Sequence, residues 1–131
     1  MEKEEKIQEI IAKLTEEAAK GTPILVEGKK DAQALLTLGV SGKIVTLKTG
    51  GKSFFDAATE LEQTGASHVI LFLDHDRRGK EGTKRLKADL ERLRIVPNTK
   101  LWQQLFSLVG KEIQCLESLP NYLQTLHTKT N

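Results

Sequence analysis

Two aspartates one residue apart, Asp74 and Asp76, follow an unbroken apolar run and are the residues best suited to chemistry. The run from Val69 to Leu73 has no polar alternation, which is typical of a strand covered on both faces of a parallel sheet. Ligands of such sheets collect where the strands end. If the chain stays extended through His75, the two carboxylates point the same way. Paired carboxylate oxygens suit Mg²⁺, which binds one or two carboxylates and shares oxygens with phosphate.

A third carboxylate, Glu27, follows another short apolar segment. Residues 24–26 are partly β-branched and lie between a proline and a glycine, so they predict a first strand that delivers Glu27 to its carboxyl end. Gly28 and Lys29 then open a tight turn before a helix expected at 31–38. Free N–H groups in such a turn can receive a phosphate.

The rest of the chain alternates between helical and extended patterns, which predicts an α/β fold. We expect further strands at 43–48, 68–74 and 111–116, and helices at 3–20, 54–63 (with Ser53 as N-cap), 80–94, 101–109 and 119–127. Pro97 is expected to end the unit that precedes residue 101. The chain is expected to form one domain over residues 1–131, with a core at about 22–118 and the helices at 3–20 and 119–127 packed on it.

Composition excludes several classes of protein. No apolar stretch approaches the roughly 18 residues that span a bilayer, and the charged N-terminus is unlike a signal peptide, so we expect a cytoplasmic protein with no membrane partner. Cys115 is the single cysteine. It excludes an internal disulfide, and we expect it to be a small buried residue, as we expect Trp102 to belong to the core.

The net charge of +2 is unevenly distributed. Residues 77–94 contain eight lysines or arginines and three acidic residues. Such a patch suits a polyanion, although a solvated helix face is the alternative. Guanidinium groups bind phosphate oxygens bidentately, which favours the two arginines directly after the aspartates. The candidate nucleic-acid contacts are Lys29, Arg77, Arg78, Lys80, Lys84 and Arg85.

The order of these motifs resembles the Toprim domain, the catalytic module shared by bacterial primases, topoisomerases, ribonucleases that mature 5S ribosomal RNA, and OLD-family nucleases. Glu-Gly-Lys-Lys-Asp begins at Glu27, after the first strand, and Asp-His-Asp-Arg-Arg-Gly begins at Asp74, after the central one. The resemblance covers about residues 22–118. It implies a compact Rossmann-like fold, with a mostly parallel central sheet of about four strands and helices on both faces.

The resemblance also implies roles for individual residues. Glu27 matches the family's general acid/base and completes a metal-binding set with Asp74 and Asp76, for Mg²⁺ or alternatively Mn²⁺. Gly28 and Gly79 match glycines that let the backbone turn tightly beside the site. The implied function is Mg²⁺-dependent phosphodiester chemistry on RNA or DNA, by a nuclease or a nucleotidyl transferase, and we favour hydrolysis because so small a domain has little to hold a template.

Differences from the motifs of individual Toprim proteins reduce the number of functions that the resemblance implies. Type IA topoisomerases carry DxDxEGE, whereas this chain has Arg78 and Lys80 at the two glutamate positions and only Glu81 directly after them. Tyr122 is the single tyrosine, and there is no zinc-binding region of the kind that primases need. The closest match is therefore a small, stand-alone, primase-like Toprim protein, with a 5S-rRNA-maturing ribonuclease as the runner-up.

Two other classes of protein share some of these sequence features. One is a Toprim module that binds nucleic acid or a protein partner without turnover. The other is a haloacid-dehalogenase-like phosphatase, which is disfavoured because only the isolated Asp89 follows Asp76 as a further aspartate. We expect His75 to be a packing residue rather than a ligand, and His68 to be structural.

Overall fold

A parallel four-stranded sheet lies at the centre of the computed structural model, which describes residues 2–47 and 53–130. The strand order is β2-β1-β3-β4, and all neighbouring strands run parallel. The strands are β1 (Ile24–Val26), β2 (Ile44–Thr46), β3 (His68–Phe72) and β4 (Val96–Asn98). Because β1 and β3 are adjacent, the segments that follow these two strands emerge side by side at one edge.

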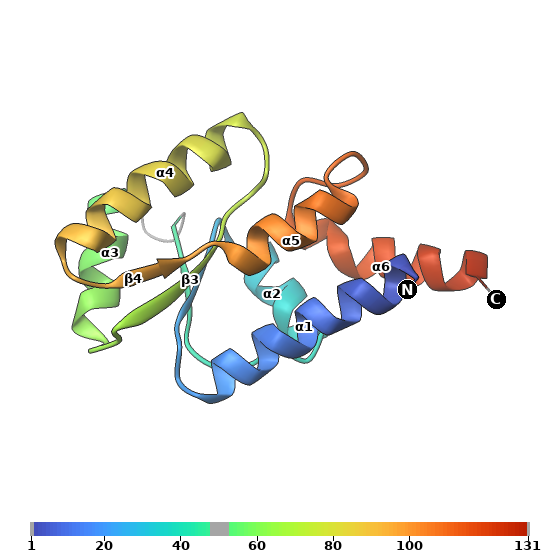
Figure 1. Cartoon of the computed structure of the whole chain (residues 1–131), viewed down its shortest axis with the longest axis horizontal. Coiled ribbons are helices and arrows are strands. Elements are labelled where there is room, and N and C mark those ends of the chain that lie inside the picture. Colours follow the sequence, from blue (N-terminus) through green and yellow to red (C-terminus); the bar gives the residue numbers. More distant parts are fainter. Residues whose placement is uncertain (1, 48–52, 131) are drawn as a thin grey trace.

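Helices connect and cover the strands (Figure 1). They are α1 (Lys3–Ala19), α2 (Lys29–Thr37), α3 (Phe54–Gln63), α4 (Arg77–Arg92), α5 (Lys100–Val109) and α6 (Leu119–Thr130), with a short 3₁₀ helix, η2 (Leu116–Ser118). No helix among the described residues is both long enough and apolar enough to span a membrane. The expected α/β fold with helices on both faces is confirmed.

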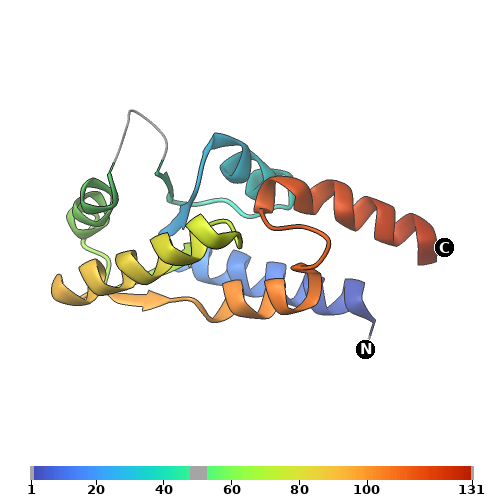
Figure 2. The ribbon, with the colours of Figure 1, turned by 90° about the horizontal axis from the view of Figure 1, so that it is seen from above.

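Each face of the sheet has its own apolar core. Alternate β3 residues such as Ile70 and Phe72 pack with α1, α5 and α6, whereas Leu71 packs with α3 and α4. All three are essentially inaccessible to solvent. The unbroken apolar run is therefore explained by burial on both sides. In Figure 2, α3 and the α1–α5 pair lie on opposite sides of the strands.

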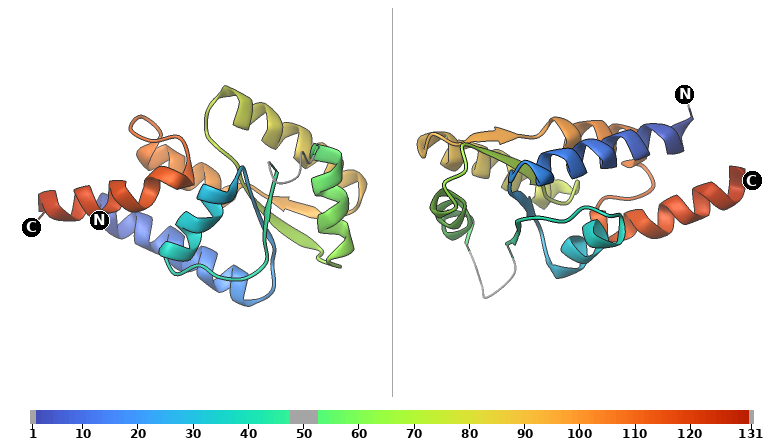
Figure 3. Two further views of the ribbon diagram at one scale, coloured as in Figure 1. Left: turned by 180° about the vertical axis from the view of Figure 1, so that it is seen from behind. Right: turned by 90° about the horizontal axis from the view of Figure 1, so that it is seen from below.

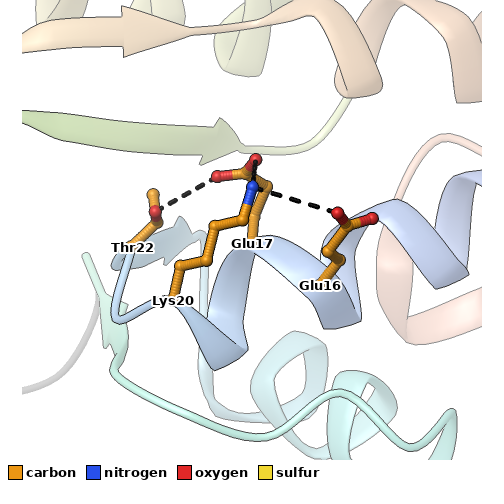
Figure 4. A network of polar contacts seen from close by, with 4 residues as sticks. All are labelled: Glu16, Glu17, Lys20 and Thr22. Carbon is orange, nitrogen blue, oxygen red and sulfur yellow. Dashed lines mark hydrogen bonds and ion pairs between the residues drawn. The ribbon is translucent and has the colours of Figure 1, made fainter.

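Polar contacts fix the junction between α1 and β1 (Figure 4). Gly21, with φ of 93°, ends α1 in the left-handed region that glycine adopts without strain. The Thr22 hydroxyl donates to Glu17 Oε2 at 3.2 Å, and Lys20 Nζ lies 3.5 Å from Glu17 Oε1 and 3.9 Å from Glu16 Oε1. These contacts hold the chain as it enters the sheet.

The two ends of the chain lie at the same end of the molecule (Figures 1 and 3). Lys3 Nζ donates to the Tyr122 hydroxyl at 3.4 Å, and His127 Nδ1 lies 3.2 Å from Glu4 Oε2. The first and last helices are thus linked, although the extent of the domain remains a prediction.

Several expected boundaries were wrong. Helix α2 begins at Lys29 rather than residue 31, α4 at Arg77 rather than residue 80, and β3 ends at Phe72 rather than residue 74. The last helix continues beyond residue 127 to Thr130. Residue 48, the last residue of the strand expected at 43–48, lies outside the described residues.

The strand expected at 111–116 is also wrong, because this segment is irregular and leads into η2. The fourth strand is instead β4, which contains Pro97. Pro97 pairs with Val69 at the sheet edge, where a residue without an N–H is tolerated. Cys115 is half-buried rather than a buried core residue.

Candidate metal and phosphate site

Glu27 and Asp74 meet at the carboxyl ends of the adjacent strands β1 and β3. The backbone N–H of Asp74 donates to Glu27 Oε1 at 3.4 Å, across 47 residues of sequence. Glu27 is 8% exposed, and no lysine or arginine of residues 2–47 and 53–130 forms an ion pair with it. Since a buried charge is costly unless it is paired, this carboxylate is suited to binding a cation.

Asp31 fixes the turn that carries Glu27. It is buried, and its Oδ2 accepts from the backbone N–H of Gly28 at 3.1 Å, while its Oδ1 accepts from the N–H of Glu117 at 2.9 Å. One side chain thus closes the first turn of α2 and ties that helix to η2. Sequence reasoning missed this role because Asp31 and Glu117 are 86 residues apart.

Asp76 is the N-cap of α4. Its backbone is extended, and its Oδ1 accepts from the N–H of Gly79 at 2.8 Å. A carboxylate oxygen has further lone pairs and Oδ2 is a second acceptor, so this cap leaves Asp76 able to bind a cation. Asp76 therefore has a structural role in addition to the role that the motif implies.

Gly79 is required by a close approach of two backbone segments. A Cβ at this position would lie 1.9 Å from the Asp74 carbonyl oxygen, which no side chain can accommodate. The last residue of the Asp-His-Asp-Arg-Arg-Gly motif thus allows α4 to begin directly against the loop that carries both aspartates.

Cationic residues occupy the first turns of α2 and α4, which both begin at this edge of the sheet. Lys29 and Lys30 open α2, and Arg77, Arg78 and Lys80 are in the first turn of α4, which has no acidic residue there. Cations are unfavourable at a helix N-terminus because of the helix dipole. At this edge of the sheet, however, the lysines and arginines lie near the free N–H groups of both helices. Together these groups attract anions.

The predicted nucleic-acid contacts do not form one uniform track. Arg77 is 93% exposed and pairs with Glu81 at 3.3 Å. Arg78 and Lys84 are exposed on the surface of α4. Arg85 lies over the ring of Phe54, 5.7 Å from its centroid, and so joins α4 to α3.

His75 points to the side of α5, into a group of aromatic rings, which agrees with the expected packing role. Its ring stacks on Phe106 with centroids 4.8 Å apart and meets the edge of Trp102 at 5.1 Å. Burial, and then the charge of Lys80, lower the pKa of His75 below its usual 6.5. Trp102 is buried as expected, and its Nε1 donates to the Leu73 carbonyl at 2.8 Å. His68 is exposed at the start of β3.

A second candidate group lies beside α2, and among the described residues it is the one whose ligand atoms converge; those of Glu27, Asp74 and Asp76 do not all come as close to one another. One ligand atom each from Asp31, Cys115 and Glu117 falls within 4.8 Å of the others, so these side chains could hold a metal ion. Both Asp31 oxygens already accept backbone N–H groups, and Lys30 lies 3.9 Å from Glu117. The protein contacts of Asp31 thus account for its burial without a metal.

These features define a class: a parallel α/β protein with carboxylates and helix N-termini at one sheet edge. Comparison with known proteins identifies the family within this class. The Toprim-like family matches residues 24–105. A UPF0292 protein of Methanocaldococcus jannaschii is 37% identical to this chain, over 91% of both chains. A UPF0292 protein of Methanosarcina barkeri is 32% identical to it, over 96% of this chain and 86% of the relative. The chain therefore belongs to the Toprim-like family, as the motifs suggested.

A solved structure of an Aquifex aeolicus protein has the same fold. It superimposes with a TM-score of 0.68 over 84% of this chain and 94% of its own, at 24% sequence identity. This likeness supports the parallel sheet and its helices and carries no residue roles.

Proposed function

We propose that this chain hydrolyses phosphodiester bonds of RNA or DNA with Mg²⁺, or alternatively Mn²⁺, as cofactor. The observation that carries the proposal is the contact of Glu27 with the Asp74 backbone at adjacent strand ends, in a chain of the Toprim-like family. A buried carboxylate without a cationic partner among the described residues would be stabilised by a metal ion bound beside it.

The donor set at this edge fits a hard cation. Asp74, Asp76 and Glu27, which accepts from the Asp74 N–H, offer only carboxylate oxygens, which Mg²⁺ prefers. When bound, Mg²⁺ neutralises negative charge that develops on the reacting phosphate.

Residues of the chain itself would transfer the proton and hold the phosphate. Glu27 is placed to move a proton at the attacking or leaving oxygen, and its contact with the Asp74 N–H orients its carboxylate. Arg77, Arg78 and the N-terminus of α4 hold the phosphate against this edge.

The test is a nuclease assay on structured RNA and on single- and double-stranded DNA, with and without Mg²⁺. Asp74→Asn and Glu27→Gln should each lower Mg²⁺-dependent cleavage by about 10²-fold or more, the usual effect of losing a general acid/base or a metal-binding group. Asp89→Asn, in a carboxylate that pairs with Arg92 at 3.3 Å elsewhere on α4, should retain activity and is the matched control. Equal activity in all variants would overturn the assignment, and strand extension with added nucleotides would favour a transferase.

A second candidate is a binding module without turnover, whose partner is nucleic acid or a protein. The observation that favours it is the use of Asp76 and Gly79 in the α4 cap and turn, which gives the motif a structural purpose. In that case Arg77→Ala/Arg78→Ala should weaken nucleic-acid binding and reduce its salt dependence by roughly one unit of slope per lost phosphate contact. Binding that survives this change, without turnover of any substrate, would favour a protein partner.

A further inference from the structure

A pocket of about 480 Å³ opens on the His75 side of the loop that carries the two aspartates. The stacked rings of His75 and Phe106 line it, and Gly110 lies beside them. A Cβ at Gly110 would lie 3.6 Å from His75 Nδ1, so the absence of a side chain leaves room next to the imidazole.

The pocket carries a positive charge from two separate elements. Lys80, in the first turn of α4, and Lys111, just after α5, both line it. Neither forms an ion pair within the part of the chain that the structure describes. The other charged lining residues, Lys3 and Glu112, pair with each other at 3.5 Å and so largely cancel. The ammonium groups of Lys80 and Lys111 therefore keep their positive charge in a pocket that is partly lined by aromatic rings.

We propose that this pocket binds a terminal phosphate, that is, a phosphomonoester. Such a group carries a charge of about −1.5 to −2 at neutral pH, which matches two ammonium groups better than a phosphodiester does. Lysine binds phosphate as a point charge and needs no bidentate geometry.

The position of the pocket indicates which molecule the bound phosphate group belongs to. His75 lies between Asp74 and Asp76 in sequence and lines the pocket, so a phosphate bound there is next to the loop of the candidate catalytic carboxylates. If the proposed function holds, on which this step rests, the terminal phosphate is the end of the nucleic-acid strand being processed. A free sugar phosphate or mononucleotide is the other source of the same group.

The first experiment uses ribose 5-phosphate, with ribose as its unphosphorylated control, in EDTA so that no metal takes part. Trp102 is the single tryptophan and contacts the His75 ring, so its fluorescence reports on the pocket. Ribose 5-phosphate should produce a saturable change and ribose none. The double variant Lys80→Ala/Lys111→Ala should bind at least about tenfold more weakly, because it loses two charge-assisted contacts.

The matched control is Lys13→Ala/Lys43→Ala, which removes the same charge from exposed lysines outside the pocket. It should bind like the wild type. No saturable change in the wild type, or equal weakening in the two double variants, would overturn the proposal. Circular dichroism melting confirms that both variants are folded.

The second experiment identifies the source of the phosphate. Single-stranded oligonucleotides with a 5′-phosphate, a 3′-phosphate or two hydroxyl ends are compared by fluorescence anisotropy, again in EDTA. A roughly tenfold preference for one phosphorylated end, lost in Lys80→Ala/Lys111→Ala, assigns the pocket to a strand terminus. Ribose 5-phosphate binding without such a preference assigns it to a free phosphoester.

Asp74→Asn separates this proposal from the proposed function. It should lose Mg²⁺-dependent cleavage and keep the response to ribose 5-phosphate. Loss of that response in Asp74→Asn would place the phosphate at the carboxylate edge and overturn the pocket assignment. An inactive wild type that still binds ribose 5-phosphate through Lys80 and Lys111 would overturn the proposed function alone.

Discussion

At the scale of single residues, Asp76 combines two roles that mutation can separate. Its carboxylate caps α4 through the Gly79 N–H at 2.8 Å, and we propose that it also binds a metal ion. Asn is as good an N-cap as Asp, whereas Ala is not. Asp76→Ala should therefore lower the free energy of unfolding by about 1 kcal/mol, and Asp76→Asn should change it little, as measured by urea denaturation without metal.

Both Asp76 variants should lose Mg²⁺-dependent turnover, because both remove the charged ligand. Full activity in Asp76→Asn would assign Asp76 to the helix cap alone. Asp76→Ser, which keeps the cap through a hydroxyl group, extends the comparison to a side chain without an amide.

His75 should make stability depend on pH. Burial and the neighbouring Lys80 lower its pKa in the folded state below the usual 6.5, so the unfolded chain binds the proton more readily. The stabilisation from neutral His75 is complete above about pH 6.5 and is lost as the pH falls through the lower folded-state pKa. His75→Phe, which retains an aromatic ring against Phe106, should reduce the fall in unfolding free energy between pH 7.5 and pH 5. An unchanged pH profile in His75→Phe would assign that fall to other groups.

At the scale of elements, the junction of β3 and α4 depends on Gly79. Ala at this position would bring its Cβ within 1.9 Å of a backbone oxygen, so the helix start must shift, at a cost of about 1–3 kcal/mol. Gly82→Ala is the control on the same helix. Its Cβ would meet side-chain atoms rather than backbone, namely the end of the Phe54 ring at 3.0 Å and Leu73 Cδ1 at 3.4 Å, and the gain in helix propensity offsets these contacts. Urea denaturation should find Gly79→Ala clearly less stable than Gly82→Ala, and equal stabilities would contradict the close approach.

The same junction explains what the sequence could and could not predict. The apolar run at 69–73 and the order of helices and strands were sufficient for the parallel sheet and for Glu27 lying beside Asp74. The helical pattern at 80–94 does not reveal that α4 begins at Arg77, because the signal for that start is Asp76, which can be a metal ligand as well as a helix cap. Pro97 predicts the end of a unit, whereas in the structure it belongs to the edge strand β4, where proline is tolerated.

Long-range contacts between irregular segments leave no periodic pattern in the sequence of the kind that helices and strands leave. The Gln114 carbonyl accepts the His75 N–H at 2.6 Å, and Asp31 binds the N–H of Glu117. Neither contact repeats with a helical or strand period, and each joins segments far apart in the chain. The segment 111–116 was therefore predicted as a strand because of its composition, and the pocket beside His75 was not predicted at all.

At the scale of the whole molecule, metal binding should be measurable as stability. A ligand that binds only the folded state stabilises it according to its concentration, by about 2.7 kcal/mol at 100 times its Kd. Mg²⁺ should therefore raise the melting temperature of the wild type. Asp74→Asn and Glu27→Gln should remove most of this increase if the metal binds at the ends of β1 and β3.

Asp31→Asn distinguishes the second group of ligand types, Asp31, Cys115 and Glu117. The amide cannot accept from both the Gly28 and Glu117 N–H groups as the carboxylate does, so this variant should be less stable without metal. Measured against its own metal-free melting temperature, however, it should keep the increase with Mg²⁺. If Asp31→Asn loses the increase and Asp74→Asn keeps it, the metal binds beside α2, and the chemistry assigned to Glu27 loses its cofactor.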